Sequence, residues 1–380
     1  KGHITTLGSK AFADYRPDHS APTVARLLRA GAILHGQSTT PEFGSKGCTS
    51  SPLWGITHNP WNRAFSAGGS SGGSAAALSA GMTILADGTD SGGSIRTPSA
   101  ANGTFGYKPP FGRNPLDAGV SLEDFVSYGP MTRSVGDAAA MLGALAGVDD
   151  NDPTSLSADV PDYLGALEEG VRGIRIGIDE QYISRDVDPV VTDALSTALD
   201  VLRGEGASIR QITMPPYDDV IDSWVPICSA EAAVGHAQIY PARAAEYGPV
   251  MGGLLETGVG LSGVDYARAI IVRRNFSGQL ARLFDGIDLI AAPAMVVPTP
   301  RNDGLDALLG APGALERLIR FTSPFDHSGN PTISLPCGFT GDGVPLGFQL
   351  IGRHLDEGLL LRAGRAFERA TVWNARHPEL

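Results

Sequence analysis

Segments with helical and strand-like patterns alternate along this chain, and that alternation narrows the folds it can adopt. The clearest unit is a strand at 174–178, then a helix with Asp188 as N-cap and Pro189 at its first position, then a strand at 208–212. Further helices are expected at 22–30, 74–80, 265–284 and 356–371, and further strands at 32–34, 82–85, 288–292, 332–335 and 346–351. The pattern predicts an α/β protein in which a sheet lies between layers of helices.

The chain is large enough for one substantial core. Its 380 residues are 42% apolar and 18% charged, as in ordinary globular proteins, and neither a fixed repeat nor a second core is visible. Residues 148–164, rich in Asp, Pro and Ser, fit a surface connection inside one domain. We therefore expect a single large domain that covers residues 1–380.

The net charge and the cysteine content indicate which binding partners and which cellular compartment suit this protein. A net charge of −12 argues against a nucleic acid or an anionic membrane as partner, because both require a basic surface. No apolar run approaches the roughly 18 residues of a membrane span. Three scattered cysteines suit a reducing cytoplasm better than a disulfide framework. These features favour a cytoplasmic monomer or homodimer that binds a small molecule.

Two serine-rich glycine loops lie within residues 65–101, which read FSAGGSSGGSAAALSAGMTILADGTDSGGSIRTPSAA. An apolar helix–strand unit separates the two loops. Glycine lets several backbone N–H groups approach one point, so such loops suit an anion or a developing oxyanion. A pair of flexible turns is the alternative explanation of the same composition.

Other motifs lack the context that their chemistry requires. A nucleophile elbow would match at 68–72, but it needs a strand directly before the serine, and 61–67 does not read as a strand. A dinucleotide fingerprint matches at 258–263 but follows a segment that reads as helical. Neither a P-loop nor a zinc-ligand spacing occurs, and the isolated histidines assemble no Ser-His-Asp triad. No metal and no organic cofactor is implied.

The segment at 65–101 resembles the defining stretch of the amidase signature family, through GGSSGGSAAA and GTDSGGSIRTPSA. Further similarity is found at 39–43, 59–61, 105–109, 129–131, 329–331 and 343–350. The resemblance covers nearly the whole chain, with a looser match over about 215–320. It implies a mixed central β-sheet covered by helices on both faces, and a serine hydrolase that cleaves carbon–nitrogen bonds of carboxylic amides.

The family uses a Ser, cis-Ser, Lys triad whose two serines lie 24 residues apart, as Ser70 and Ser94 do. By resemblance, Ser94 attacks the carbonyl and Ser70, which follows a cis peptide bond, relays the proton. The resemblance also implies an oxyanion hole and residues that support it. The hole is expected from the backbone N–H groups of Ser91, Gly92, Gly93 and Ser94, and the support from Ser71, Thr89, Asp90 and Arg96.

The family's general base is a buried neutral lysine, and no lysine of this sequence fits its motif. The motif places that lysine ahead of a Gly–Ser pair matched by residues 8–9, and hence before Lys1. Surface or loop positions are expected for Lys10, Lys46 and Lys108. We expect the natural chain to carry the base just upstream of Lys1, and the alternative is a truncated chain without activity.

The implied reaction is acyl transfer through an acyl-enzyme on Ser94. A small amide, carbamate (urethane) or ester is the expected substrate, since each develops an oxyanion at a carbonyl. Apolar or aromatic substrates are favoured by a set of candidate pocket residues. These are Trp54, Trp224, Tyr240 and residues 250–255, for each of which ordinary core packing is the alternative. Two alternatives remain: a glutaminase-type subunit of a tRNA-dependent amidotransferase complex, and a binding protein that kept the fold without activity.

Overall fold

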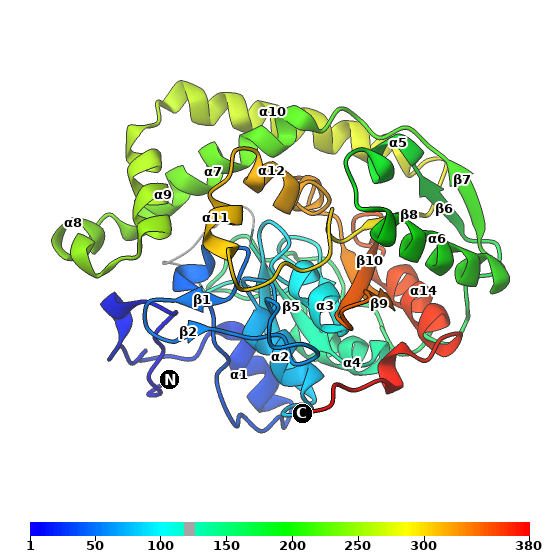
Figure 1. Ribbon diagram of the computed structural model, residues 1–380, viewed down its shortest axis with the longest axis horizontal. Coiled ribbons are helices and arrows are strands. Elements are labelled where there is room, and N and C mark those ends of the chain that lie inside the picture. The colour runs from blue at the N-terminus through cyan, green and yellow to red at the C-terminus, as the bar shows by residue number, and fades with distance from the viewer. Residues whose placement is uncertain (118–125) are drawn as a thin grey trace.

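The computed structural model of the protein describes residues 1–117 and 126–380, and its centre is an eight-stranded β-sheet (Figure 1). Across the sheet the strands are β3 (Leu85–Asp90), β5 (Ser127–Thr132), β4 (Phe105–Lys108), β9 (Thr332–Phe339), β10 (Pro345–Gly352), β8 (Leu289–Pro293), β6 (Arg175–Ile178) and β7 (Ser208–Gln211). Neighbours from β3 to β8 pair antiparallel, whereas β8, β6 and β7 run parallel. The sheet is therefore mixed, as expected.

Helices cover both faces of this sheet. One face packs against α4 (Val135–Leu145), α6 (Pro189–Gly204) and α14 (Glu357–Arg369), and the other against α2 (Gly72–Ser79) and α3 (Arg96–Asn102). The largest apolar cluster lies between the sheet and the first set of helices, where burial of apolar surface stabilises the domain. The α/β fold with helices on both faces is confirmed.

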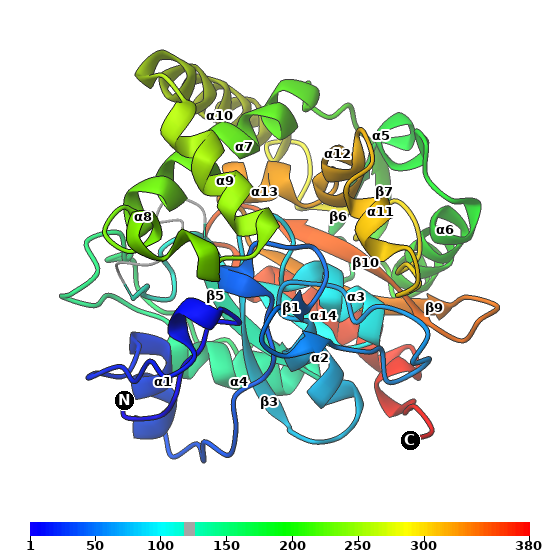
Figure 2. The ribbon, with the colours of Figure 1, turned by 60° about the vertical axis from the view of Figure 1, so that its left-hand side comes forward.

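A helical array lies on one side of the molecule, at the upper left in Figures 1 and 2. It contains α7 (Asp218–His236), α9 (Pro249–Gly260) and α10 (Gly263–Leu283), and α7 packs against both of the others. The short helix α13 (Ser323–His327) contacts α7 and α10 and so connects the array to the body of the fold. The array falls within the part of the sequence where the family resemblance is loosest.

The remaining elements are short. They are α1 (Pro22–Arg29), α5 (Glu180–Ser184), α8 (Tyr240–Arg243), α11 (Leu305–Leu309), α12 (Ala314–Ile319), β1 (Ser50–Ser51), β2 (Gly55–Ile56) and 3-10 turns at Lys10–Phe12, Glu42–Gly44, Ala244–Glu246 and Trp373–Ala375. Within residues 1–117 and 126–380, no helix combines the length and the apolar character that crossing a membrane requires.

Helix α6 forms as the sequence predicts. The side chain of Asp188 accepts a hydrogen bond from the N–H of Val190 at 3.0 Å, and Pro189 begins the helix. The side chains that α6 buries are Val191, Leu195, Ala198, Leu199 and Leu202. Their spacing places them on one face of the helix, which packs against the sheet.

Two strand predictions are wrong. Residues 32–34 form no strand, and the strand expected at 82–85 begins only at Leu85, as β3. Ile33 is 86% exposed and Ile84 is 73% exposed. An apolar run becomes a strand only where a neighbouring strand and a covering layer meet it, and neither run has both. The sequence pattern also misses β4 and β5, whose glycine and proline residues lower their strand propensity.

Candidate active site

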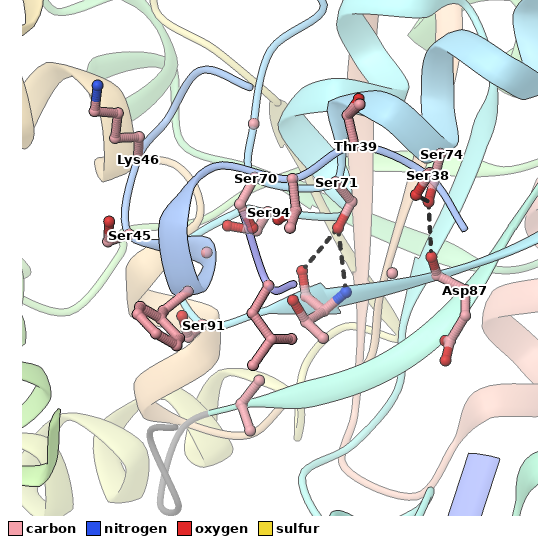
Figure 3. A pocket seen from close by; sticks show the side chains of 18 of the residues that line it. Ser38, Thr39, Ser45, Lys46, Ser70, Ser71, Ser74, Asp87, Ser91 and Ser94 are labelled. Atoms are coloured by element: carbon pink, nitrogen blue, oxygen red, sulfur yellow. Dashed lines mark hydrogen bonds between the residues drawn. The ribbon is translucent and has the colours of Figure 1, made fainter. Parts of the chain in front are cut away.

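The two glycine loops predicted from the sequence meet beside the end of β3. The N–H of Ser71 donates a hydrogen bond to the carbonyl oxygen of Ser94 at 3.1 Å and so joins the loops. Ser70 and Ser94 both line one cavity of about 1710 Å³ (Figure 3). The Gly69–Ser70 peptide bond is cis, as expected. Neither serine hydroxyl is hydrogen-bonded to any group in the described part of the chain, which leaves both available to a ligand.

Thr49 holds the Ser70 loop in shape from a separate segment of the chain. Its hydroxyl lies within donating distance of the carbonyl oxygens of Gly68 (2.9 Å) and Ser70 (3.1 Å), and it accepts the N–H of Gly72 at 3.0 Å. The side chain is buried, so water could not take over these hydrogen bonds if the Thr49 hydroxyl were removed. Nothing in the local sequence marks Thr49 for this task, and sequence reasoning missed it.

Asp90 organises the loop that carries Ser94. Its carboxylate accepts hydrogen bonds from the backbone N–H groups of Gly93 (2.7 Å), Ile95 (3.0 Å) and Arg96 (3.3 Å). Two further hydrogen bonds come from the Arg96 guanidinium, through Nε at 2.9 Å and Nη2 at 2.8 Å. The carboxylate thus fixes the backbone on both sides of the candidate nucleophile.

Arg96 connects this loop to the C-terminal part of the chain. Its Nη2 lies 2.8 Å from the carboxylate of Asp90 and 2.7 Å from that of Asp326, and its Nη1 donates to the carbonyl of Thr322 at 2.9 Å. Burial alone would raise the pKa of Asp90, but the charge and hydrogen bonds of Arg96 lower that pKa to about 2. At Asp326 burial prevails and raises the pKa to about 8. The Arg96 guanidinium thus pairs with two buried carboxylates, and Asp90 is the one whose pKa it lowers.

Two carbonyl groups of the same turn are held by side chains from distant elements. The indole Nε1 of Trp224, on α7, donates to the carbonyl of Ser91 at 2.7 Å, and the hydroxyl of Thr322 donates to the carbonyl of Gly92 at 2.6 Å. Gly93 has φ = +117°, a conformation that favours glycine over any other residue. Sequence reasoning assigned neither contact, because residues 224 and 322 come close to the turn only through the tertiary fold.

The predicted oxyanion hole is only partly available. The N–H of Gly93 donates to Asp90, so the structure removes Gly93 from the set of donors that a ligand can use. Among the residues that the structure describes, no acceptor is hydrogen-bonded to the N–H groups of Ser91, Gly92 and Ser94, and all three residues line the cavity. Within that part of the chain, three of the four predicted N–H donors therefore remain free.

Ser71 and Thr89, two of the predicted supporting residues, contact each other. The hydroxyl of Ser71 accepts the N–H of Thr89 at 3.2 Å and lies 3.4 Å from its carbonyl oxygen (dashed lines in Figure 3). This contact attaches the first loop to β3, the strand that leads into the second loop. The hydroxyl of Ser71 therefore fixes the relative position of the two loops.

Comparison with known proteins identifies the family of this chain. The family model described as Amidase matches residues 1–361. The chain belongs to the amidase family. A glutamyl-tRNA(Gln) amidotransferase subunit of Chloroflexus aggregans is 36% identical over 409 aligned residues, which cover 100% of this chain and 82% of the relative.

Two solved structures show the same fold. A bacterial aryl acylamidase of the amidase signature family superposes with a TM-score of 0.90 at 28% identity, over 98% of this chain and 80% of that one. A 6-aminohexanoate cyclic dimer hydrolase superposes with a TM-score of 0.92 at 28% identity, over 100% of this chain and 84% of that one. This amidase-family chain is accordingly a serine hydrolase of the amidase signature group.

The lysines that the structure describes do not lie where a general base for the serine pair would have to be. Lys10 is exposed, and Figure 3 shows the Lys46 side chain extending away from Ser70 and Ser94. The surface or loop position expected for Lys108 is wrong, because this residue is buried on β4. Burial lowers its pKa to about 8, but its ammonium donates to the carbonyl of Pro109 and the residue does not line the cavity. No described lysine thus meets the predicted serine pair.

The cavity wall is mainly apolar. Trp224, Val250, Met251, Gly253 and Leu254 line it, as the sequence suggested. The predicted residues that do not line it are Trp54, Tyr240, Gly252 and Leu255. Among the described lining residues, the aspartates, glutamates, lysines and arginines contribute one cation, Lys46, and one carboxylate, Asp87. Figure 3 places these two groups on opposite sides of the serine pair.

His327, next to Asp326, is a buried histidine. Its Nε2 lies 3.0 Å from the hydroxyl of Ser223 and its Nδ1 2.9 Å from the carbonyl of Ser323. Burial lowers the pKa of His327 to about 3. The folded state therefore keeps this histidine neutral, whereas the unfolded chain protonates it below its ordinary pKa of about 6.5.

The contribution of His327 to stability should consequently fall as the pH falls from 6.5 toward 3. At pH 5 the expected loss from this group is about 2 kcal/mol in the free energy of unfolding, because only the unfolded state binds the proton. Urea titrations at pH 7 and pH 5 measure this difference. His327→Gln has no such proton to bind, so on going from pH 7 to pH 5 its free energy of unfolding should change by about 2 kcal/mol in its favour relative to the unmodified protein. An equal pH dependence in both proteins would contradict the assignment.

Proposed function

We propose that this amidase hydrolyses small apolar amides through an acyl-enzyme on Ser94, with carbamates and esters as further substrates. The observation that carries the proposal is one cavity lined by Ser70 and by three residues of the second loop whose N–H groups have no hydrogen-bonded acceptor among the described residues. These three residues are Ser91, Gly92 and Ser94. A substrate carbonyl placed there can receive the Ser94 oxygen while its own oxygen accepts hydrogen bonds from Ser91, Gly92 or Ser94. Such donors stabilise the charge that develops in the transition state.

In the proposed reaction the Ser94 oxygen bonds to the carbonyl carbon, and its proton passes to the hydroxyl of Ser70. Ser70 gives its own proton to the general base, and a proton returns by the same route to the departing amine. Water then attacks the acyl-enzyme and releases the acid and the free Ser94 hydroxyl. By the family resemblance, the base in this proposal is a buried, neutral lysine.

The scarcity of charged groups in the cavity supports an apolar substrate. Free glutamine would bring an α-ammonium and an α-carboxylate on one carbon atom, and each needs a charged partner once it leaves water. Lys46 and Asp87 lie on opposite sides of the serine pair and are therefore poorly placed to hold both groups of one amino acid. Apolar side chains such as Trp224 and Met251 suit a hydrocarbon substituent better.

A glutaminase-type subunit of an amidotransferase complex is the second candidate. It is favoured by the 36% identity to the Chloroflexus glutamyl-tRNA(Gln) amidotransferase protein, which extends over the whole of this chain. The two candidates share the nucleophile and differ in the group recognised around the scissile amide. Substrate choice therefore separates them, whereas labelling of the nucleophile does not.

A matched pair of substrates tests the choice. Butanamide is glutamine without its α-ammonium and α-carboxylate, so the two compounds present the same scissile amide. We expect the natural protein to hydrolyse butanamide with a kcat/KM at least about 100-fold above that for glutamine, because burying two unpaired charges costs several kcal/mol. Ammonia release measures both rates. A preference for glutamine would establish the second candidate instead.

A further inference from the structure

Trp224 makes two contacts with the turn that precedes Ser94. Its indole N–H donates to the carbonyl of Ser91 at 2.7 Å. Its ring also lies against Gly92, where an added Cβ would be only 3.2 Å from Nε1 and 3.3 Å from Cε2. The indole therefore fixes both the direction of one carbonyl and the space beside the next residue.

Because the peptide bond is planar, the contact of Trp224 with the Ser91 carbonyl also sets the direction of the Gly92 N–H. In a trans peptide unit the C=O of one residue and the N–H of the next point in opposite directions. Holding the Ser91 carbonyl at Trp224 therefore directs the N–H of Gly92 away from the indole. The following unit behaves in the same way, since Thr322 holds the Gly92 carbonyl while the N–H of Gly93 donates to Asp90.

Helix α7 supplies a rigid support for the indole. Ser223, the neighbour of Trp224, lies 3.0 Å through its hydroxyl from Nε2 of His327 on α13. The next residue back along α13 is Asp326, which pairs with Arg96 at 2.7 Å. Both the indole and the turn that it contacts are therefore attached to α13.

We propose that Trp224 is a positioning residue for the oxyanion site, in which its indole N–H orients the Gly92 N–H toward the developing oxyanion. The inference rests on the proposed function, because it concerns the same acyl transfer on Ser94. It extends that function to a residue from the part of the chain with the loosest family resemblance. The competing view is that Trp224 only forms part of the cavity wall.

Kinetics of Trp224→Phe separate these two roles. With p-nitrophenyl acetate, whose acetyl group is too small to need the indole as a wall, we expect kcat to fall about 10- to 100-fold with KM changed less than about threefold. Both formation and hydrolysis of the acyl-enzyme pass through an oxyanion, so kcat falls whichever step limits it. A wall residue would instead raise KM for long acyl groups and leave kcat for the acetyl ester unchanged.

Trp61→Phe is the matched control. The indole of Trp61 also donates to a backbone carbonyl, that of Asn102 at 2.8 Å, but at the far end of α3 from Ser94. Its loss removes the same kind of hydrogen bond and should leave kcat for p-nitrophenyl acetate unchanged. An equal loss of kcat in both variants would mean that general destabilisation, and not positioning, explains the effect.

A second measurement avoids the change in ring size. Site-specific incorporation of benzothienylalanine at position 224 keeps the bicyclic shape and replaces the N–H by sulfur. We expect this protein to bind a trifluoromethyl ketone, which forms an oxyanion on the serine, more weakly by the same factor as kcat falls, while affinity for a non-reacting amide stays unchanged. Unchanged binding of the ketone would overturn the proposal. If the unmodified protein itself forms no adduct at Ser94, that result contradicts the proposed function. A failure of the Trp224 proposal alone would appear only in the modified protein, so the two outcomes can be told apart.

Discussion

Replacement of Ser94 by alanine should lower kcat for amide hydrolysis by about 10⁴-fold or more, since losing the nucleophile of a serine hydrolase has an effect of that size. The Ser94 hydroxyl makes no hydrogen bond within the described residues, so stability should change little. Rates of amine release and thermal unfolding of the same preparation measure both effects. Activity within tenfold of the unmodified protein would exclude Ser94 as the nucleophile.

Ser70→Ala provides the informative comparison with this variant. A proton relay contributes about 10²- to 10⁴-fold, so Ser70→Ala should also be slow on amides. It should nevertheless still form an acyl-enzyme on Ser94 with an activated ester, whose leaving group needs no proton. An acyl group found on Ser70 in the Ser94→Ala protein would reverse the two roles.

Replacement of Asp90 by asparagine should damage both activity and stability. The two carboxylate oxygens accept five hydrogen bonds, and asparagine would turn an NH₂ group toward donors on one side. It would also remove one of the two carboxylates that pair with the buried Arg96. We expect kcat to fall about 100-fold or more through a disordered oxyanion turn, and stability to fall by about 3 to 5 kcal/mol.

Asp288→Asn is a matched control for Asp90→Asn. Asp288 also holds an arginine, Arg175, through Nε at 3.1 Å and Nη2 at 2.8 Å, and accepts the Arg175 backbone N–H at 2.7 Å. This pair is partly exposed and lies between β6 and the start of β8, away from the cavity. Its loss should cost less stability and leave kcat unchanged. Equal losses of kcat in both variants would contradict the special role of Asp90.

Local sequence patterns predicted the fold where local preference and tertiary packing agree. Helix α6 is the clear case, because its N-cap at Asp188, its first-turn proline and its apolar period all favour the same structure. Residues 82–85 are the opposite case. Their apolar character favours a strand, yet β3 is the edge of the sheet and its partner β5 pairs only from Leu85 onward. The start of β3 is therefore set by its pairing with β5, which lies much later in the sequence.

The candidate site divides in the same way. Ser70, Ser94, Asp90 and Arg96 stand in two short motifs, so their association could be predicted from the sequence and the family resemblance. Thr49, Trp224 and Thr322 come from three separate segments and contact the loops only after folding. The commitment of the Gly93 N–H to Asp90 is likewise a feature of three-dimensional geometry, which spacing alone does not reveal.

The most direct test of this account is to react the natural protein with a fluorophosphonate and to locate the adduct by mass spectrometry. The reagent forms a phosphorus–oxygen bond with an activated serine and releases fluoride. We predict one adduct per chain, on Ser94, and none in the Ser94→Ala protein. An adduct on Ser70, or no adduct on any serine of a folded protein, would contradict the assignment of Ser94 as the nucleophile.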